Sequence, residues 1–221
     1  SGGYQRSGEE FLITDLNDYG LIDVVEIIKY SSNVGAALAS ETAGAESFHR
    51  MLRLFGFGER TGVSLNGEER GLLKEPEEWS GRTQQTIAIG QEIGVTALQL
   101  VAAATVFAND GVLLRPQIVQ RVVSPEGKTL RRFTREPVRE VVSSEVARQM
   151  LDMMEAATEP DSTARRIEVE EVSVSAKTGT AEVYDPEIGS YSEEHFIAST
   201  LAIFLSEEPQ YILYVMIDHP R

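Results

Sequence analysis

The chain has 221 residues, of which 42% are hydrophobic, so it is long enough to bury the core of one domain. Its net charge of -15 argues against a nucleic-acid-binding surface, because phosphate binding relies on clustered Lys and Arg. The absence of cysteine excludes disulfides, a thiolate nucleophile and Cys-ligated metal sites. His49, His195 and His219 share no metal-ligand spacing, so we expect surface or packing roles for them and neither a metal site nor a cofactor.

The longest mostly apolar run extends from Val95 to Ala108 and is interrupted by Thr96, Gln99 and Thr105. It is shorter than the roughly 20 residues that a membrane-spanning helix needs. No signal peptide is visible, and a membrane anchor on a longer parent protein is left open.

The first half of the chain predicts helices. Residues 21–30 have the apolar spacing of a short buried helix that Asp23 caps, and the Ala-rich segment 34–42 is compatible with a second helix. Residues 45–55 predict a third helix, ended by Gly56 and Gly58. Its apolar face consists of Phe48, Met51, Leu52 and Phe55.

The middle of the chain alternates turns, helices and short strands. Turn residues dominate 61–79, and Thr96 is the expected N-cap of a helix that runs to Ala108. Residues 117–123 and 129–142 predict a strand or hairpin around the Pro125-Glu126-Gly127 turn. Ser143 or Ser144 is expected to cap a further helix, which Pro160 ends and which bears Val146, Met150, Leu151 and Met154.

Three strands are predicted at the end of the chain. Val172, Val174 and Ala176 alternate with polar residues, and further strands are expected over about 195–205 and 211–218. The short turn between the last two predicts an antiparallel hairpin. Helices in about 15–160 followed by sheet strands in about 168–221 favour an α+β fold in one domain, 1–221.

Two short motifs carry the candidate chemistry. Lys177-Thr178-Gly179-Thr180 ends the first of these strands, and Ser31-Ser32-Asn33 follows the first helix. They match two of the three signatures of penicillin-interacting serine enzymes. The third, Ser-x-x-Lys, supplies the nucleophile and is absent, because none of the four lysines has Ser three residues before it. Each motif alone also occurs by chance.

These residue types suit acyl transfer from a peptide that ends in a free carboxylate. Lys177 supplies a cation, and Thr178 and Thr180 supply hydroxyls for that carboxylate. Gly179 lets a substrate backbone lie close to the strand, because it has no Cβ. Ser31 offers a hydroxyl for proton transfer, and the Asn33 amide can orient neighbouring groups.

Beyond these motifs, the chain resembles the transpeptidase domain of class B penicillin-binding proteins. Matching blocks run almost from end to end: Ser31-Ser32-Asn33-Val34-Gly35, Phe55-Gly56-Phe57-Gly58, Thr61-Gly62, Gly71-Leu72, Trp79, Ile89-Gly90-Gln91, Val95-Thr96-Ala97-Leu98-Gln99, Ala108-Asn109-Asp110-Gly111, Arg115-Pro116, Lys177-Thr178-Gly179-Thr180-Ala181 and Ile217-Asp218-His219-Pro220. The resemblance implies the fold shared by penicillin-binding proteins and serine β-lactamases.

The resemblance also implies individual roles. Ser31 would relay a proton to the leaving amine, and Asn33 would bond the catalytic lysine and a substrate amide. Lys177 would set the positive potential, with Thr178 and Thr180 binding the carboxylate of the substrate or of a β-lactam. The Thr180 N–H would form half of the oxyanion hole.

The chain departs from the family pattern in two loops and in extent. Family members usually have glycine in place of Glu92 and a Gly-Thr-rich loop in place of Asp161-Ser162-Thr163-Ala164. We expect the chain to be truncated before the Ser-x-x-Lys helix and before a final helix of the family fold.

The expected parent is a peptidoglycan D,D-transpeptidase that cross-links stem peptides through an acyl-serine. The resemblance implies stem peptides, β-lactam antibiotics and the division or elongation machinery as partners, and no nucleic acid. It also implies a place on the extracytoplasmic face of the cytoplasmic membrane, through an anchor absent from this chain.

Two alternatives stay open. One is a serine β-lactamase or D,D-carboxypeptidase, although Ser32 stands where class A β-lactamases have Asp and Gly62 precedes Leu65-Asn66 where they need Glu. The other is a non-catalytic relative, a scaffold or sensor that lost its nucleophile. A Ser-x-x-Lys upstream of Ser1 would indicate an enzyme, and a substituted serine would indicate the non-catalytic relative.

Overall fold

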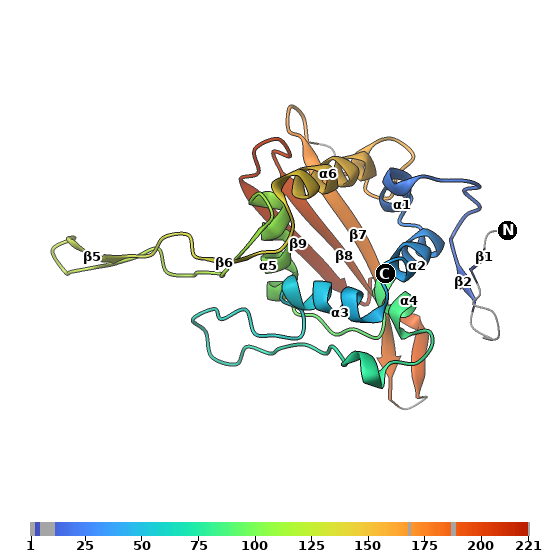
Figure 1. The fold of residues 1–221 in the computed structure, drawn as a ribbon. Helices are drawn as coiled ribbons and strands as arrows, with labels where there is room; N and C mark the ends of the chain where they lie inside the picture. Colours follow the sequence, from blue (N-terminus) through green and yellow to red (C-terminus); the bar gives the residue numbers. More distant parts are fainter. Residues whose placement is uncertain (1–2, 5–11, 168, 187–188, 221) are drawn as a thin grey trace.

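A computed structural model describes residues 3–4, 12–167, 169–186 and 189–220 (Figure 1). Its helices are α1 Val24–Tyr30, α2 Asn33–Glu41, α3 Ala45–Leu54, η1 Pro76–Glu78, α4 Thr83–Ala88, α5 Ala97–Ala108, α6 Ser144–Glu155 and η2 Ala156–Thr158. Its strands are β1 Gly3–Tyr4, β2 Ile13–Thr14, β3 Val112–Leu114, β4 Arg121–Val123, β5 Thr129–Arg132, β6 Pro137–Glu140, β7 Val174–Asp185, β8 Ser190–Phe204 and β9 Tyr211–Asp218. The architecture is α+β, as the sequence predicts.

The largest sheet is antiparallel and has the order β7-β8-β9. Its register places Lys177 opposite Leu201 and Leu201 opposite Tyr214. Helices α5 and α6 cover one face of this sheet (Figure 1). Ile203 on that face is fully buried against Ala104, Leu151 and Met154 of the two helices, with Ile28 of α1 at the margin. This packing fixes α1, and therefore the Ser31 turn that follows it, against the sheet.

The opposite face of the sheet is covered over only part of its area. Val174, Ala176 and Ala202 are buried there against Ala157 and Ala164, which follow α6. On β9 the side chains of the same parity, from Tyr211 to Ile217, are exposed. On this face of the sheet, the part beside β7 is buried in a hydrophobic core, whereas the apolar side chains of β9 are exposed to solvent.

Several sequence-predicted caps are confirmed. Asp23 forms a capping box with Glu26 at the start of α1, and Thr96 forms one with Gln99 at the start of α5. Ser143, rather than Ser144, caps α6 by accepting a hydrogen bond from the Val146 N–H. These ends were predictable because a cap is made by residues two or three positions apart.

Two predictions about the first 142 residues are wrong in part. The buried residue of α3 is His49, whereas Met51 of the predicted apolar face is 41% exposed. The predicted hairpin around 125–127 is confirmed, because β4 pairs with β5. Residues 129–142 do not form one strand, however, because β6 pairs with β3, which the sequence did not predict. Pairing with two different strands divides this segment.

Helix α4 was also missed. It has six residues, and no side chain caps its start at Arg82. Its sequence, Thr-Gln-Gln-Thr-Ile-Ala, is largely polar although Thr83, Gln85 and Thr86 are buried. The sequence has neither a capping residue nor an apolar periodicity from which this helix could be predicted. The helix is found only in the structure, where it packs against α2.

Both loops that depart from the family pattern contain left-handed backbone. Glu92 has a φ of 56° and Asp161 a φ of 66°, a region that favours glycine. Glu92 accepts a hydrogen bond from the Thr83 hydroxyl at 2.9 Å, which holds its side chain beside α4. At both positions the backbone has a conformation that favours glycine, although the residues are larger.

None of the described helices combines the length and the apolar composition that crossing a lipid bilayer requires.

Candidate active site

The Ser31-Ser32-Asn33 motif forms a tight junction between α1 and α2. Ser31 is the C-cap of α1 and has left-handed backbone angles, with φ 55° and ψ 47°. Ser32 is the N-cap of α2, where its hydroxyl accepts a hydrogen bond from the Gly35 N–H at 2.9 Å. A Cβ on Gly35 would lie 2.5 Å from Cγ1 of Ile27, so glycine permits the two helices to meet closely. This junction turns the Ser31 side chain toward the sheet.

Residues before α1 hold the junction from the other side. The Asp15 carboxylate accepts hydrogen bonds from the Ser32 hydroxyl at 2.7 Å and from the Val34 N–H at 3.1 Å. The Asn33 side chain donates to the Thr14 carbonyl at 3.2 Å. Asp15 had not been predicted, because an isolated acidic residue 16 positions before the motif carries no sequence signal.

Lys177 of β7 contacts this junction directly. Its Nζ donates to Oγ of Ser31 at 2.6 Å and to the Thr178 carbonyl at 2.8 Å. The two predicted motifs, 146 positions apart in the chain, therefore meet in one place. Hydroxyl and ammonium groups at this distance can exchange a proton.

Burial lowers the pKa of Lys177 from its usual 10.5 to about 8. The physical cause is the loss of water around the ammonium group, which disfavours the charged form. The pKa of Lys29 is raised instead, because its ammonium group donates a hydrogen bond to the Glu159 carboxylate at 2.6 Å. Lys177 is thus mainly charged at neutral pH but close to releasing its proton.

The other three residues of the Lys177 motif lie along the same stretch of β7, and the prediction that the motif ends this strand is wrong, because β7 continues to Asp185. Side chains alternate along a strand, so Thr178 and Thr180 leave it on the opposite face from Lys177. Thr180 is exposed and Thr178 is half-buried. In the described sheet β7 pairs only with β8, so these residues lie on an edge strand.

Gly179 has a local reason to lack a side chain. A Cβ there would lie 2.9 Å from Oγ of Ser199, its partner on β8. The residue therefore makes room for a neighbouring hydroxyl as well as leaving the strand edge open. Its predicted close approach to a substrate stays a prediction.

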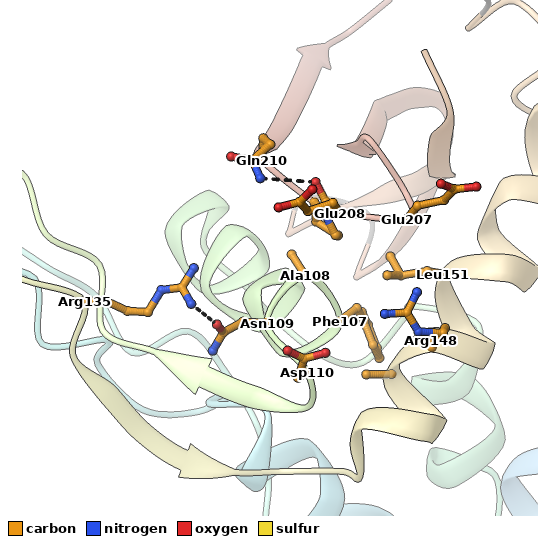
Figure 2. Close-up of a pocket in the computed structure, with 12 residues that line it drawn as sticks. Phe107, Ala108, Asn109, Asp110, Arg135, Arg148, Leu151, Glu207, Glu208 and Gln210 are labelled. Carbon is orange, nitrogen blue, oxygen red and sulfur yellow. Dashed lines mark hydrogen bonds between the residues drawn. The ribbon is translucent and has the colours of Figure 1, made fainter. Parts of the chain in front are cut away.

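Two described cavities lie away from this site. Figure 2 shows one of about 300 Å³, between the end of α5, α6 and the β8–β9 turn. Arg135 donates to Asn109 at its rim, and Arg148, Glu207 and Glu208 add mixed charges. The other, of about 230 Å³, includes Gln99 among its lining residues. Neither is lined by Ser31, Asn33 or Lys177, which instead lie at the α1–α2 junction and on β7.

Comparison with known protein families agrees with this geometry. The family model of the penicillin binding protein transpeptidase domain matches residues 1–221. Penicillin-binding protein PbpB of Mycolicibacterium smegmatis is 34% identical over 197 residues, which cover 86% of this chain and 30% of that protein. Stage V sporulation protein D of Bacillus subtilis is 32% identical over 204 residues, covering 92% of this chain and 31% of that protein. The chain thus spans about a third of the length of these relatives.

Solved structures give the same result. Penicillin-binding protein 3 of Mycobacterium tuberculosis in complex with aztreonam superposes with a TM-score of 0.91 at 31% identity, covering 99% of this chain and 50% of that one. The transpeptidase domain of Burkholderia pseudomallei penicillin-binding protein 3 gives a TM-score of 0.86 at 26% identity, with 99% and 62% covered.

Proposed function

The chain belongs to the family of penicillin-binding protein transpeptidase domains, of the class B type, and on that basis we propose that it forms part of a peptidoglycan D,D-transpeptidase. The substrate class is a stem peptide that ends in a free carboxylate. The enzyme cleaves the terminal peptide bond, holds the acyl group on a serine and transfers it to an amine of a neighbouring stem peptide.

The observation that carries the proposal is the contact between Lys177 and Ser31. A half-buried lysine with a lowered pKa, 2.6 Å from a serine hydroxyl, suits proton relay. The charged form of Lys177 would also attract the carboxylate of a peptide C-terminus. Both functions belong to acyl transfer from a peptide C-terminus.

Each motif residue has a place in this proposal. Ser31 passes a proton toward the leaving amine, and Lys177 holds the positive potential. Thr178 and Thr180 bind the carboxylate from the edge of β7, and the Thr180 N–H donates to the oxyanion. Asn33 orients the substrate amide and the catalytic lysine.

The acylated serine is assigned to a Ser-x-x-Lys segment outside the 221 residues, since no lysine in them completes that motif. The 221-residue chain on its own is therefore expected to form no covalent adduct with a fluorescent penicillin. Removal of a catalytic nucleophile lowers kcat by about 10⁶-fold. A stoichiometric adduct seen by intact-mass spectrometry would contradict this expectation and show that another serine reacts.

The partners follow from the same proposal. The structural relative from M. tuberculosis was solved with aztreonam, and we extend β-lactam acylation to the protein that contains this domain. Its substrates lie outside the cytoplasmic membrane, so the domain is placed on the extracytoplasmic side. Proteins of division or elongation are its proposed assembly partners.

The test uses the longer protein with its Ser-x-x-Lys segment. Ser31→Ala and Lys177→Ala are expected to slow acylation by fluorescent penicillin by about 10²- to 10⁴-fold while the fold is kept. Ser47→Ala and Lys128→Ala, at exposed positions on α3 and in the β4–β5 turn, are the matched controls. Parental acylation rates in both Ser31 and Lys177 variants would overturn the site assignment. No acylation in the unaltered longer protein would favour a non-catalytic scaffold.

A further inference from the structure

Residues 118–133 form a basic arm that projects from the body of the molecule (Figure 1). Strands β4 and β5 make up its two sides and, in the described part of the chain, pair only with each other. The turn between them is Ser124-Pro125-Glu126-Gly127-Lys128. Each strand therefore has one edge whose backbone groups have no strand partner.

The base of the arm is held firmly. Arg139 of β6 donates from Nε to the Leu54 carbonyl at 2.9 Å, and Arg115 lies 3.1 Å from the Glu136 carboxylate. The Gln117 side chain bridges to the Thr134 carbonyl at 2.8 Å. These contacts fix the direction in which the arm leaves the body.

The charge of the arm is opposite to that of the molecule. It carries four basic residues and one acidic residue, a net charge of +3, whereas the whole chain has -15. The register places Arg121 directly opposite Arg132, and like charges at facing positions repel. Among the described residues neither arginine has a carboxylate in ion-pair contact. No ion pair among the described residues relieves this repulsion.

The arm is also apolar at its surface. Leu130 is 64% exposed, and Val122 and Val123 are more than 40% exposed. A two-stranded hairpin without a covering layer is only marginally stable in water. Exposed aliphatic groups, facing arginines and free strand edges therefore occur together on one small element.

We propose that the basic arm docks an extended acidic segment of a partner protein, which adds a strand to β4 or β5. Carboxylates on alternate residues of such a segment neutralise Arg121 and Arg132. Aliphatic residues between them cover Val122, which leaves β4 on the opposite face from Arg121, and the backbone pairs with the free edge.

The features of the arm favour this partner over two others. A lipid surface would be met first by the turn, which is polar, contains Glu126 and lacks an aromatic residue. In a second copy of this chain the exposed strand β9 carries Asp218 as its single carboxylate, so it cannot place carboxylates on alternate residues opposite the arginines. An acidic strand would neutralise the arginines, cover exposed apolar side chains and form hydrogen bonds with the unpaired backbone edge.

The test probe is a synthetic peptide of four alternating Glu-Val repeats, titrated into the 221-residue chain by calorimetry. Binding is expected to weaken as salt rises. The double variant Arg121→Glu with Arg132→Glu is expected to bind about tenfold or more weakly, since several exposed charge pairs become repulsive. The matched control is Arg50→Glu with Arg166→Glu, which makes the same charge change at exposed positions outside the arm.

Two further peptides separate charge from strand pairing. A Glu-Val peptide with alternate backbone nitrogens methylated is expected to lose binding, because it cannot complete a ladder. Hydrogen exchange should slow at residues 121–123 or 129–132 when the unmodified peptide is bound. Equal binding of a Ser-Val peptide, or equal loss in both double variants, would overturn the proposal. Arm-dependent binding of vesicles with 30% anionic lipid, without binding of the peptide, would also overturn it and assign the arm to a lipid surface.

Discussion

At the scale of single residues, Lys177 is the group whose chemistry depends most on its surroundings. Its pKa of about 8 means that the folded chain binds fewer protons than the unfolded chain between about pH 8 and 10.5. The free energy of unfolding therefore gains a contribution that rises with pH across that window. Below about pH 8 the lysine is charged in both states and the burial cost is fully present.

This behaviour gives the first prediction. In Lys177→Met the rise in unfolding free energy between pH 8 and 10.5 is expected to be smaller than in the unaltered chain. The measurement is urea unfolding at several pH values, together with NMR titration of ¹³Cε-labelled lysine. A Lys177 resonance that titrates at its usual 10.5 would show that the ammonium group is hydrated.

Asp15 gives a second prediction, because it holds the Ser31 junction without belonging to either motif. Asp15→Ala removes the acceptor of two hydrogen bonds and is expected to lower the free energy of unfolding by about 1–3 kcal/mol. In the longer protein it should also slow acylation. Asp152→Ala, exposed on α6, is the control in urea unfolding. If Asp15→Ala and Asp152→Ala lowered the free energy of unfolding equally, Asp15 would not position the Ser31 junction.

At the scale of elements, α5 organises the loops around it through one side chain. Gln99 is 1% exposed, and its Nε2 donates to the carbonyls of Glu59 at 2.8 Å and Arg70 at 2.9 Å. Its Oε1 accepts from the Thr96 N–H at 2.9 Å, which completes the helix cap. The helix and two loops distant in sequence are therefore joined at this residue.

The third prediction is that Gln99→Leu lowers the free energy of unfolding by about 3 kcal/mol. The new side chain fills the space but leaves the Glu59 and Arg70 carbonyls without this donor, and each partly buried group left unpaired costs about 1–3 kcal/mol. Gln149→Leu, exposed on α6, controls for the change in residue type. A loss below about 1 kcal/mol in chemical denaturation would mean that water replaces the amide.

At the scale of the whole molecule, β9 is the exposed side of the sheet. It pairs with β8 only in the described sheet, and Tyr211, Leu213, Val215 and Ile217 are between 46% and 71% exposed. A free strand edge beside an apolar surface favours pairing with another chain. The net charge of -15 opposes this, but salt screens it beyond about 8 Å.

The fourth prediction is that the 221-residue chain self-associates at micromolar concentration through β9. Leu213→Lys with Val215→Lys is expected to shift the sedimentation coefficient toward that of a monomer. Leu130→Lys, at a position in the basic arm that is even more exposed, should leave the association unchanged. A compact monomer at all concentrations, with cooperative unfolding, would contradict the role given to β9.

The sequence by itself determined the features that depend on neighbours along the chain. Asp23, Thr96 and Ser143 were predictable as caps because the groups that they bond are two or three residues away. The three strands of the main sheet followed from alternation and from the short turn after β8. The motifs at Ser31 and Lys177, together with the matching blocks along the chain, led to the correct family, and the order of helices before strands led to an α+β fold.

Only the tertiary structure decided how distant residues meet. The contact between Ser31 and Lys177 spans 146 positions and depends on α1 packing against the sheet, which no local pattern encodes. The same is true of Asp15, whose role exists only because the segment before α1 folds back on the junction. The lowered pKa of Lys177 follows from burial by residues far along the chain. Interactions between neighbouring residues specified the helices and strands, and packing between residues distant in sequence brought the site residues together.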